Sequence, residues 1–390
     1  MFALLLTSWS FFMQNRYSPW WMPTLIAALL VVCLSLFAAL VLNSATKNKT
    51  TEHRQAAVND AGTVYQWDLV TSWPKRFPGL GLGPELFAEK VQKMSSGRLQ
   101  ITVHGANTIV PALGVFDAVS AGSVEMGHSA AYYWKGKIPA AVFFTSVPFG
   151  MTAQEFNAWI NYGGGLELWQ EIYEPYNLIP LPGGNTGTQM GGWFNVEIQS
   201  PEDIQGLKMR IPGLGGEVFS RAGGTAVNIP GAELFNALQT GVIDATEWVG
   251  PYNDLAMGFQ QIAKYYYFPG WHEPGPAMEF TINKQAWQSL PEELQQIVIS
   301  AAQSVNQLML DEYQARSLVA LQQIQQQSNV EIRRFPESVL ATYKQAALDI
   351  YAESAAEDKL FEKVYLHYWA YLEKARAYAD IAEKAYMDLR

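Results

Sequence analysis

Apolar and polar positions follow two different periods along the chain, and these periods predict both strands and helices. Residues 64–71 and 97–103 alternate apolar and polar side chains with a period of two, which predicts strands. Residues 84–94 carry apolar side chains three and four positions apart and begin with a proline, which predicts a helix. Short strands separated by amphipathic helices are typical of an α/β fold.

The last third of the chain has helical spacing almost throughout. Leu290-Pro-Glu-Glu is a start signal for a long helix that we predict to run to about Gln327. Residues 336–390 are rich in Ala, Tyr, Leu, Glu and Lys at helical spacing. The pattern therefore predicts a long helical extension at the C-terminus.

The most apolar run lies near the N-terminus, where residues 23–42 contain no charge. A helix rises ~1.5 Å per residue, so this run is long enough to cross a hydrocarbon core of ~30 Å. It is also longer than the usual signal-peptide core of roughly 7–15 residues. Residues 1–45 are therefore predicted to be a signal peptide or an uncleaved membrane anchor, and a start at Met13 would give a more ordinary signal peptide. The polar residues 46–63 are predicted to be a linker.

Residues 110–125 resemble residues 229–244, with four residue types at the same spacing. Each copy predicts a helix started by proline, a glycine C-cap and a short strand, and two such units predict two similarly built lobes. A generic helix–glycine–strand junction is the alternative. Continuing the match pairs His128 with Glu247 and Ser129 with Trp248, beyond the strands, where ligands collect in open α/β sheets. The matched positions are Pro111 and Pro230, Phe116 and Phe235, Ala118 and Ala237, and Gly122 and Gly241.

Composition argues against several classes of function. The formal net charge is −10, which does not suit the basic face that nucleic acid requires, so we expect no nucleic-acid partner. The single cysteine, Cys33, lies in the apolar N-terminal run, so the rest of the chain has no thiol nucleophile and no cysteine ligands for a metal. The five histidines lack metal-ligand spacing, and there is neither a G-x-S-x-G elbow nor a Walker loop. We therefore predict no catalytic residues.

Three charged side chains and one amide are the candidates for a binding site. Arg210 lies in an apolar strand and needs an anionic partner, because burying an unpaired charge is costly. Its planar fork suits a carboxylate, although a structural salt bridge or a solvent-facing position is the alternative. Glu247 ends a predicted strand, and Glu273 lies in a Pro/Gly turn, although either could simply cap or solvate a loop. Gln189 could supply an amide oxygen to the same site.

The summed charge of these candidates indicates a cation. Two glutamates and a monoanionic ligand carry −3, and Arg210 brings the sum to −2. A divalent ion such as Ca²⁺ would neutralise the set, whereas Na⁺ would leave −1, and both are hard cations that take oxygen ligands. The aromatic pair Tyr132 and Tyr133 follows the first of the two repeated units and is a candidate wall for the ligand.

These motifs together resemble a known family. The runs LKMRIPG and F-x-A-L-x-x-G-x-I-D-A-x-E-W-V-G-P resemble the DctP-type extracytoplasmic receptors of tripartite ATP-independent periplasmic (TRAP) transporters. NTGTQMGGWF, the Glu247-Trp248 pair, WHEPG and the helical C-terminus resemble the branch that binds 2-oxo acids or lactate together with a metal ion. The similarity covers residues 64–390, and the extended apolar N-terminus is a departure from it.

The resemblance implies a role for each candidate. Arg210 would bind the substrate carboxylate, with Gln189 and the two tyrosines as further substrate contacts. Glu247, the backbone carbonyl of Trp248 and Glu273 would ligate the cation. The ligand would be a small 2-oxo or 2-hydroxy monocarboxylate, such as pyruvate or lactate, which the receptor delivers to membrane permease subunits.

The resemblance also implies an architecture, a bilobal type II periplasmic-binding-protein fold with a long helical C-terminal extension. We expect lobe 1 at residues 64–187 and lobe 2 at 188–277, with 278–312 returning to lobe 1 and 313–335 crossing to lobe 2. The helices of 336–390 would form a homodimer. We expect a periplasmic protein, with a tether to the inner membrane by the apolar run as the alternative to release.

Two other classes compete with a receptor. A metal-dependent enzyme acting on 2-oxo acids, such as a lyase, would use the same carboxylates and cation, and it would need a general base, for which His128 is the one candidate. A structural membrane-anchored protein would not respond to any small acid.

Overall fold

A computed structural model describes residue 27 and residues 34–39, 62–327 and 329–390. The chain divides into two compact units, residues 1–63 and 64–390. In the first unit, residues 34–39 are helical and exposed. The predicted apolar segment 23–42 otherwise lies outside the described residues. Among the residues that are described, no helix has both the length and the apolar composition that crossing a bilayer requires.

The first sheet of the second unit is built mainly from the chain's first half. It contains β1 (Tyr65–Thr71), β2 (Leu99–His104), β3 (Met126–Ser129), β4 (Leu178–Asn185) and β10 (Ala277–Asn283), in the order β2-β1-β3-β10-β4. β1 runs parallel to both of its neighbours, and β10 runs antiparallel to β3 and β4. Phe87 and Val91 of α2 (Leu82–Met94) are fully buried and belong to one apolar cluster with Leu69 and Phe280 of the sheet. We call the part of the molecule around this sheet lobe 1.

The second sheet is built mainly from residues that follow. It contains β5 (Gly192–Phe194), β6 (Lys208–Arg210), β7 (Thr225–Val227), β8 (Ala245–Thr246), β9 (Tyr265–Phe268) and β11 (Glu331–Arg334), in the order β11-β9-β5-β8-β6-β7. β6 runs parallel to β7 and β8, so their carboxyl ends meet at one edge. The helices α6 (Gly213–Arg221), α7 (Leu234–Gln239) and α8 (Pro251–Met257) connect these strands. We call this part lobe 2.

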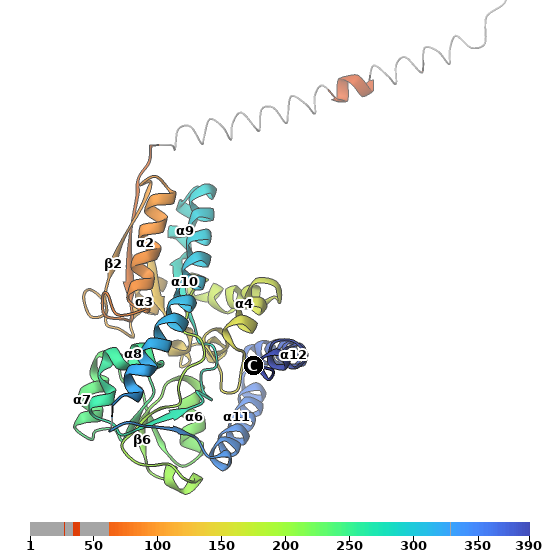
Figure 1. Cartoon of the computed structure of the whole chain (residues 1–390). Helices are drawn as coiled ribbons and strands as arrows, with labels where there is room; N and C mark the ends of the chain where they lie inside the picture. The colour runs from red at the N-terminus through yellow and green to blue at the C-terminus, as the bar shows by residue number, and fades with distance from the viewer. Residues whose placement is uncertain (1–26, 28–33, 40–61, 328) are drawn as a thin grey trace, which may run out of the picture. The chain divides into compact units, whose positions relative to one another are not determined.

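One long helix links the two lobes. α10 (Glu292–Gln325) contacts α2 and β4 of lobe 1 and α8 of lobe 2, and Figure 1 shows it running down the molecule from the side of α2 to α8. Its buried residues, such as Leu294 and Val305, recur at helical spacing, as expected for a helix that packs against the protein with one face. The predicted start at Leu290 and end near Gln327 agree with these bounds to within two residues.

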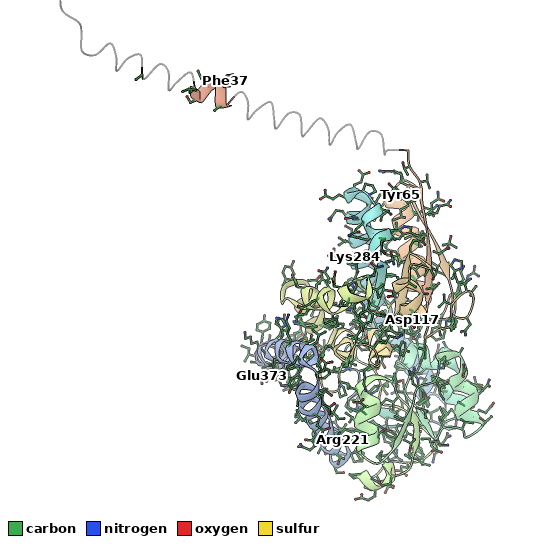
Figure 2. The ribbon with its side chains drawn as sticks, turned by 180° about the vertical axis from the view of Figure 1, so that it is seen from behind. Phe37, Tyr65, Asp117, Arg221, Lys284 and Glu373 are labelled. Carbon is green, nitrogen blue, oxygen red and sulfur yellow. The ribbon has the colours of Figure 1, made fainter. Side chains whose placement is uncertain are left out.

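The C-terminal extension is helical, as predicted, and packs on both lobes. It consists of α11 (Glu337–Glu357), α12 (Lys359–Ile381) and α13 (Glu383–Met387). Arg221 at the end of α6, labelled in Figure 2, donates from both terminal nitrogens to Glu353 of α11, at 2.6 and 2.5 Å. Tyr368 of α12 accepts the Met151 backbone N–H of lobe 1 through its hydroxyl at 2.6 Å. The extension is therefore part of the folded unit, because side chains of α11 and α12 form hydrogen bonds or ion pairs with each lobe.

The predicted mixed α/β, two-lobed fold is confirmed, and one local prediction is wrong. In the first copy α3 (Val115–Ser120) begins four residues after Pro111, which precedes a turn, whereas in the second copy Pro230 caps a 3₁₀ helix that leads directly into α7. The glycine ends are as predicted: Gly122 and Gly241 have φ of 71° and 73°, and β3 and β8 follow them. The lobe boundaries assigned from the sequence stay a prediction. The remaining short elements are η1 (Ala131–Trp134), η2 (Pro139–Phe144), α4 (Ala153–Tyr162), α5 (Gly165–Tyr173), η3 (Glu174–Tyr176), η4 (Pro201–Ile204), η5 (Gly231–Glu233), η6 (Phe259–Gln261) and α9 (Lys284–Ser289).

Candidate functional site

Two adjacent parallel strands of lobe 2 end in oppositely charged residues. Arg210 is the last residue of β6 and lies opposite Thr246, the last residue of β8. Glu247 follows at once, and its backbone N–H donates to the Arg210 carbonyl at 3.1 Å. β6 ends here because Pro212, two residues on, has no N–H to continue the ladder. The two side chains therefore meet beyond the carboxyl ends of strands, where the sequence predicted a ligand site.

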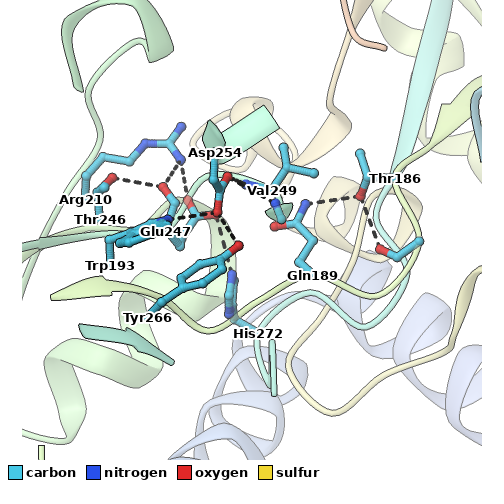
Figure 3. A network of polar contacts seen from close by, with 12 residues as sticks. Thr186, Gln189, Trp193, Arg210, Thr246, Glu247, Val249, Asp254, Tyr266 and His272 are labelled. Carbon is cyan, nitrogen blue, oxygen red and sulfur yellow. Dashed lines mark hydrogen bonds and ion pairs between the residues drawn. The ribbon is translucent and has the colours of Figure 1, made fainter. Parts of the chain in front are cut away.

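Arg210 is buried, with 1% of its surface exposed, and pairs with Glu247. Its Nη1 donates to Oε1 of Glu247 (Figure 3), and Nε donates to the Ile229 carbonyl at 3.2 Å. Burial alone lowers the pKa of Arg210, but Glu247 and the nearby Tyr133 raise it, and the net shift is upward. The guanidinium is therefore held fully charged inside the protein.

The loop that carries Glu273 is held against the segment that carries Gln189. The Gln189 N–H donates to the Glu273 carbonyl at 3.2 Å, and the Gly270 N–H donates to the Gln189 carbonyl at 3.0 Å. A Cβ on Gly270 would lie 2.3 Å from that carbonyl oxygen, so only glycine allows this approach. The Met190 N–H continues the pairing with the Val249 carbonyl at 3.1 Å. Backbone hydrogen bonds thus bring three separate segments of lobe 2 to one place.

Glu273 is a buried carboxyl group beside a second one. Burial raises its pKa well above the usual range, and the charge of Glu247 raises it further, while Arg210 and a hydrogen bond from Tyr132 act in the opposite direction. An added positive charge at this position would therefore stabilise the ionised form of Glu273.

Several polar atoms of these residues have no hydrogen-bond partner although they are buried. They are Oε2 of Glu247, Oε1 of Gln189, and both ring nitrogens of His272. The Gln189 Nε2 donates to the Thr186 hydroxyl at 3.2 Å, which fixes the amide and leaves its oxygen free. Buried polar groups in folded proteins are nearly always paired, so several unpartnered atoms gathered at one place fit a cation or ligand bound between them.

The structure also adds a residue to the site that sequence reasoning missed. One donor atom from each of Glu247, His272 and Glu273 lies within 4.8 Å of the other two, and all three side chains are buried. Sequence reasoning found no metal role for any histidine because it searched for regular spacing along the chain. The available signal was the position of His272 directly beside Glu273.

Lobe 1 contributes aromatic side chains to the same place. Tyr133 lies with its hydroxyl oxygen 3.4 Å from Nη2 of Arg210, and burial raises the pKa of this phenol and of Tyr132. The Trp248 ring packs against Trp73 and Phe77, with ring centroids 6.3 and 6.1 Å apart. The charged site of lobe 2 is therefore covered by aromatic residues of lobe 1.

A second acid near the site, Asp254, has a structural role. Its carboxylate accepts hydrogen bonds from Trp193 Nε1 at 3.0 Å and the Tyr266 hydroxyl at 2.7 Å, and from the backbone N–H groups of Val249 and Gly250 (Figure 3). Burial raises its pKa to about 7, although these donors lower it. Asp254 thereby fixes the start of α8 and the segment that follows Trp248.

His128 is not available as a general base. Its Nδ1 accepts from Trp73 Nε1 at 2.9 Å, and its Nε2 lies 3.1 Å from the Gly183 carbonyl. Burial lowers its pKa to about 4, which the bond to Gly183 opposes. Both ring nitrogens form hydrogen bonds within the core of lobe 1, so His128 is not free to act as the general base of an enzyme.

Two α/β lobes that enclose a buried charged site with unpartnered acceptors define a bilobal solute-binding protein. The family model for bacterial extracellular solute-binding proteins, family 7 (DctP), matches residues 70–358. The chain therefore belongs to this family. Its role is in transport and not in catalysis, and its place of action is extracytoplasmic.

Individual relatives are similar over most of the chain. The monocarboxylate 2-oxoacid-binding periplasmic protein of Nostoc sp. (strain PCC 7120) is 44% identical over 321 residues, which cover 82% of this chain and 88% of the relative. A TRAP periplasmic solute binding protein from Colwellia psychrerythraea, solved with bound calcium and pyruvate, has a TM-score of 0.82 and 44% identity, and the match covers 84% of this chain and 100% of that chain. A counterpart from Pseudoalteromonas atlantica T6c, solved with bound sodium and pyruvate, has a TM-score of 0.82 and 46% identity, with 84% and 99% covered. The predicted family and branch are confirmed.

Proposed function

We propose that this protein binds a small 2-oxo or 2-hydroxy monocarboxylate, such as pyruvate, together with a metal cation, and delivers it to the membrane permease of a TRAP transporter. The observation that carries the proposal is the buried set of Arg210, Glu247 and Glu273, in which Oε2 of Glu247 has no partner. The positive Arg210 suits the carboxylate of a small acid, and the two glutamates suit a cation bound beside it. Similar proteins of known structure hold pyruvate with calcium or sodium.

Arg210 is the residue suited to the ligand's carboxylate. Its Nη1 and Nε are engaged within lobe 2, whereas in the described part of the chain Nη2 has one hydrogen-bond contact, at 3.4 Å to Tyr133. A carboxylate placed between Arg210 and the two tyrosines would form a charge-assisted hydrogen bond. The unpartnered oxygen of Gln189 points to a further polar contact at the same place.

The donors present fit a hard cation. Glu247 offers Oε2 and Glu273 offers a second carboxylate, and the family resemblance implies the backbone carbonyl of Trp248 as a further oxygen donor. A bound cation would neutralise these carboxylates and offer open positions to a 2-oxo or 2-hydroxy acid. The two glutamates and Arg210 sum to −1, and a monoanionic ligand brings the sum to −2, so a divalent ion balances the set fully and Na⁺ balances half of it.

Ligand binding would couple to closure of the lobes, because the site is shared. Arg210 and both glutamates belong to lobe 2, while Tyr132 and Tyr133 belong to lobe 1. A ligand held by both sets favours the closed arrangement by the difference in its affinity for the closed and open forms. The closed receptor would be the form that docks on the permease.

A thermal-shift screen tests this function. Purified protein stripped with a chelator is heated with pyruvate, lactate, 2-oxobutyrate or acetate, with and without added Ca²⁺ or Na⁺. We expect a large rise in Tm only for the 2-oxo or 2-hydroxy acids and only with a cation. The acid should be recovered chemically unchanged after long incubation, whereas turnover would support an enzyme.

The location of the protein is a second part of the proposal. We infer a periplasmic protein, because the family is extracytoplasmic and the chain carries the apolar run 23–42. Both cleavage after this run and retention as a tether fit its composition. Fractionation of cells followed by N-terminal sequencing separates the two, since only a cleaved protein starts near residue 46.

Homodimer formation is the third part. The last helices expose several large apolar side chains, and Tyr378, Ile381, Tyr386 and Leu389 are each more than half exposed. Exposed apolar side chains in one region mark an interaction surface, and a second copy of the chain is the partner that the family resemblance implies. Light scattering of wild type and of an Ile381→Asp variant tests this, because the variant should shift toward monomer. A wild-type monomer at all concentrations would contradict it.

A further inference from the structure

His272 is buried at the centre of the charged site and lacks hydrogen-bond partners. Only 1% of its surface is exposed, and among the residues that the structure describes neither Nδ1 nor Nε2 has a hydrogen-bond partner, although Nε2 lies near Glu247. A neutral imidazole carries one donor and one acceptor, so both groups lose their hydration without replacement. Such a loss costs stability, typically about 1–3 kcal/mol per unsatisfied group. A bound ion would give this ring the partner that it does not find in a hydrogen bond.

The position of the ring is fixed by close packing. A Cβ placed on Gly215 of α6 would lie 3.0 Å from the Cβ of His272, so α6 approaches the histidine closely. The Trp271 ring lies beside it, with centroids 5.4 Å apart. The imidazole is therefore held by its surroundings and has little freedom to find another partner.

The unpartnered nitrogen faces the unpartnered oxygen of the site. Nε2 of His272 lies 3.5 Å from Oε2 of Glu247 (Figure 3), at the limit of a hydrogen bond. A carboxylate oxygen of Glu273 completes the group within 4.8 Å. The 3.5 Å between Nε2 and Oε2 suits two donors on one ion, since metal–ligand bonds of ~2.0–2.2 Å allow donors at most about 4.4 Å apart. Two carboxylates and one imidazole are a mixed oxygen and nitrogen donor set.

We propose that His272 is a third side-chain ligand of the cation site, and that its nitrogen extends the range of bound ions to first-row divalent cations such as Mn²⁺. This rests on the proposed function, because it deepens the chemistry of the same site. Imidazole favours transition metals, whereas Ca²⁺ and Na⁺ prefer oxygen. The site would thus accept Ca²⁺ through its oxygens and bind Mn²⁺ through the same oxygens and His272.

The test uses Mn²⁺ as a paramagnetic probe of the full-length chain, purified without a histidine tag. Pulsed electron paramagnetic resonance of the Mn²⁺-loaded protein detects ¹⁴N coupling only when an imidazole nitrogen is bound directly to the ion. We expect this coupling in the wild type and its loss in His272→Gln. Added Ca²⁺ should displace the Mn²⁺, which shows that both ions use one site.

Affinities give a second readout. Glutamine supplies an amide oxygen, which is a suitable ligand for Ca²⁺. It removes the imidazole nitrogen, a ligand that strengthens the binding of Mn²⁺. We therefore expect His272→Gln to weaken Mn²⁺ binding about tenfold and to leave Ca²⁺ binding within about threefold. His104→Gln is the matched control, because His104 pairs with Asp68 near the surface of lobe 1 and should change neither affinity nor coupling.

Each remaining outcome is decisive. Mn²⁺ that binds competitively with Ca²⁺ but shows no ¹⁴N coupling would overturn the proposal and make His272 a residue that only positions Glu247. Absence of Mn²⁺ binding, with Ca²⁺ and pyruvate still bound, would also overturn it while leaving the proposed function intact. Failure to bind Ca²⁺ and pyruvate as well would contradict the proposed function itself.

Discussion

The molecule contains two kinds of buried carboxyl group, and they differ in what surrounds them. Glu279 of lobe 1 accepts a hydrogen bond from Trp134 Nε1 at 2.6 Å on one oxygen and from the Tyr173 hydroxyl at 2.7 Å on the other. Glu247 of lobe 2 accepts from Arg210 on one oxygen, and its other oxygen has no hydrogen-bond partner among the described residues. Both carboxyl groups are fully buried. The protein itself satisfies both oxygens of Glu279, whereas the free oxygen of Glu247 is suited to a bound cation.

This difference separates a structural acid from a binding acid. A buried polar group that the fold satisfies contributes to a unique core, whereas one left unsatisfied is tolerated where a ligand completes it. Asp254, with its four donors, belongs with Glu279 although it lies close to the site. Glu273, beside Glu247, belongs with the binding group. The comparison therefore predicts opposite responses to mutation in the two groups.

The largest effect is expected at Arg210. Arg210→Ala leaves Glu247 charged and buried without its partner, which should destabilise the protein by about 3–5 kcal/mol. It also removes the group for the ligand carboxylate, a loss of about 2–5 kcal/mol, so pyruvate affinity should fall by at least about 30-fold. Urea unfolding and calorimetry measure the two quantities.

A double variant separates stability from binding in that experiment. Arg210→Met with Glu247→Met removes both charges, so most of the stability should return while pyruvate binding does not. Folded Arg210→Ala protein with wild-type affinity for pyruvate would remove Arg210 from the site.

The next effect is expected at Glu273. Glu273→Gln keeps the shape and removes one negative charge, so Ca²⁺ affinity should fall by about 30-fold or more. Without a cation the variant should be about as stable as the wild type, because the raised pKa of Glu273 disfavours its ionised form and glutamine is neutral as well. The Tm without a cation measures the stability, and the rise in Tm on adding Ca²⁺ measures the affinity for the ion. Glu279→Gln is the control, and an equal loss of Ca²⁺ response in both variants would end the distinction between the two groups.

Glu279 offers a test by pH. Burial raises its pKa to about 7, although Trp134 and Tyr173 lower it, so the folded state holds its proton more tightly than the unfolded state. The stability from that proton is fully present below the unfolded value near 4.3 and is lost as pH rises to about 7. Relative to Glu279→Gln, the wild type should lose about 2–3 kcal/mol between pH 5 and pH 8. Urea unfolding of both proteins at the two pH values measures this, and an unchanged difference would mean that Glu279 is ionised throughout.

The smallest effect is expected at an ion pair that joins the lobes near the surface. Lys135, which follows η1 of lobe 1, pairs with Glu217 of α6 in lobe 2, and their side chains are 30% and 41% exposed. Exposed pairs contribute about 0.2–1 kcal/mol, so Lys135→Ala should weaken pyruvate binding by at most about fivefold. Lys93→Ala, which breaks an exposed pair within α2, is the matched control and should have no effect on affinity. A loss at Lys135 as large as that at Arg210 would place part of the binding energy outside the buried site.

The sequence was informative where motifs and periods carry the structure. The alternation of periods predicted the α/β lobes and the long helices, because strand and helix periods depend on local burial. The motif LKMRIPG around Arg210, the Glu247-Trp248 pair and the WHEPG turn around Glu273 pointed to residues that the structure brings together in lobe 2. Their assignment as ligands is still a proposal.

Other features needed three dimensions. His272 joins the site because the turn at Gly270 packs its segment against Gln189, a contact between residues far apart in sequence. The network around Asp254 joins β5, β9 and the start of α8, which no spacing along the chain reveals. The helix start after Pro111 was misplaced because a proline fits a turn as well as a first helical position.

The central claim is that acid and cation bind as one set, and linkage between them tests it most directly. Calorimetry gives the affinity of pyruvate with and without Ca²⁺, and the affinity of Ca²⁺ with and without pyruvate. Because coupling is reciprocal, we expect each ligand to strengthen the other by the same factor. Pyruvate that binds chelator-treated protein as tightly as Ca²⁺-loaded protein would contradict the account.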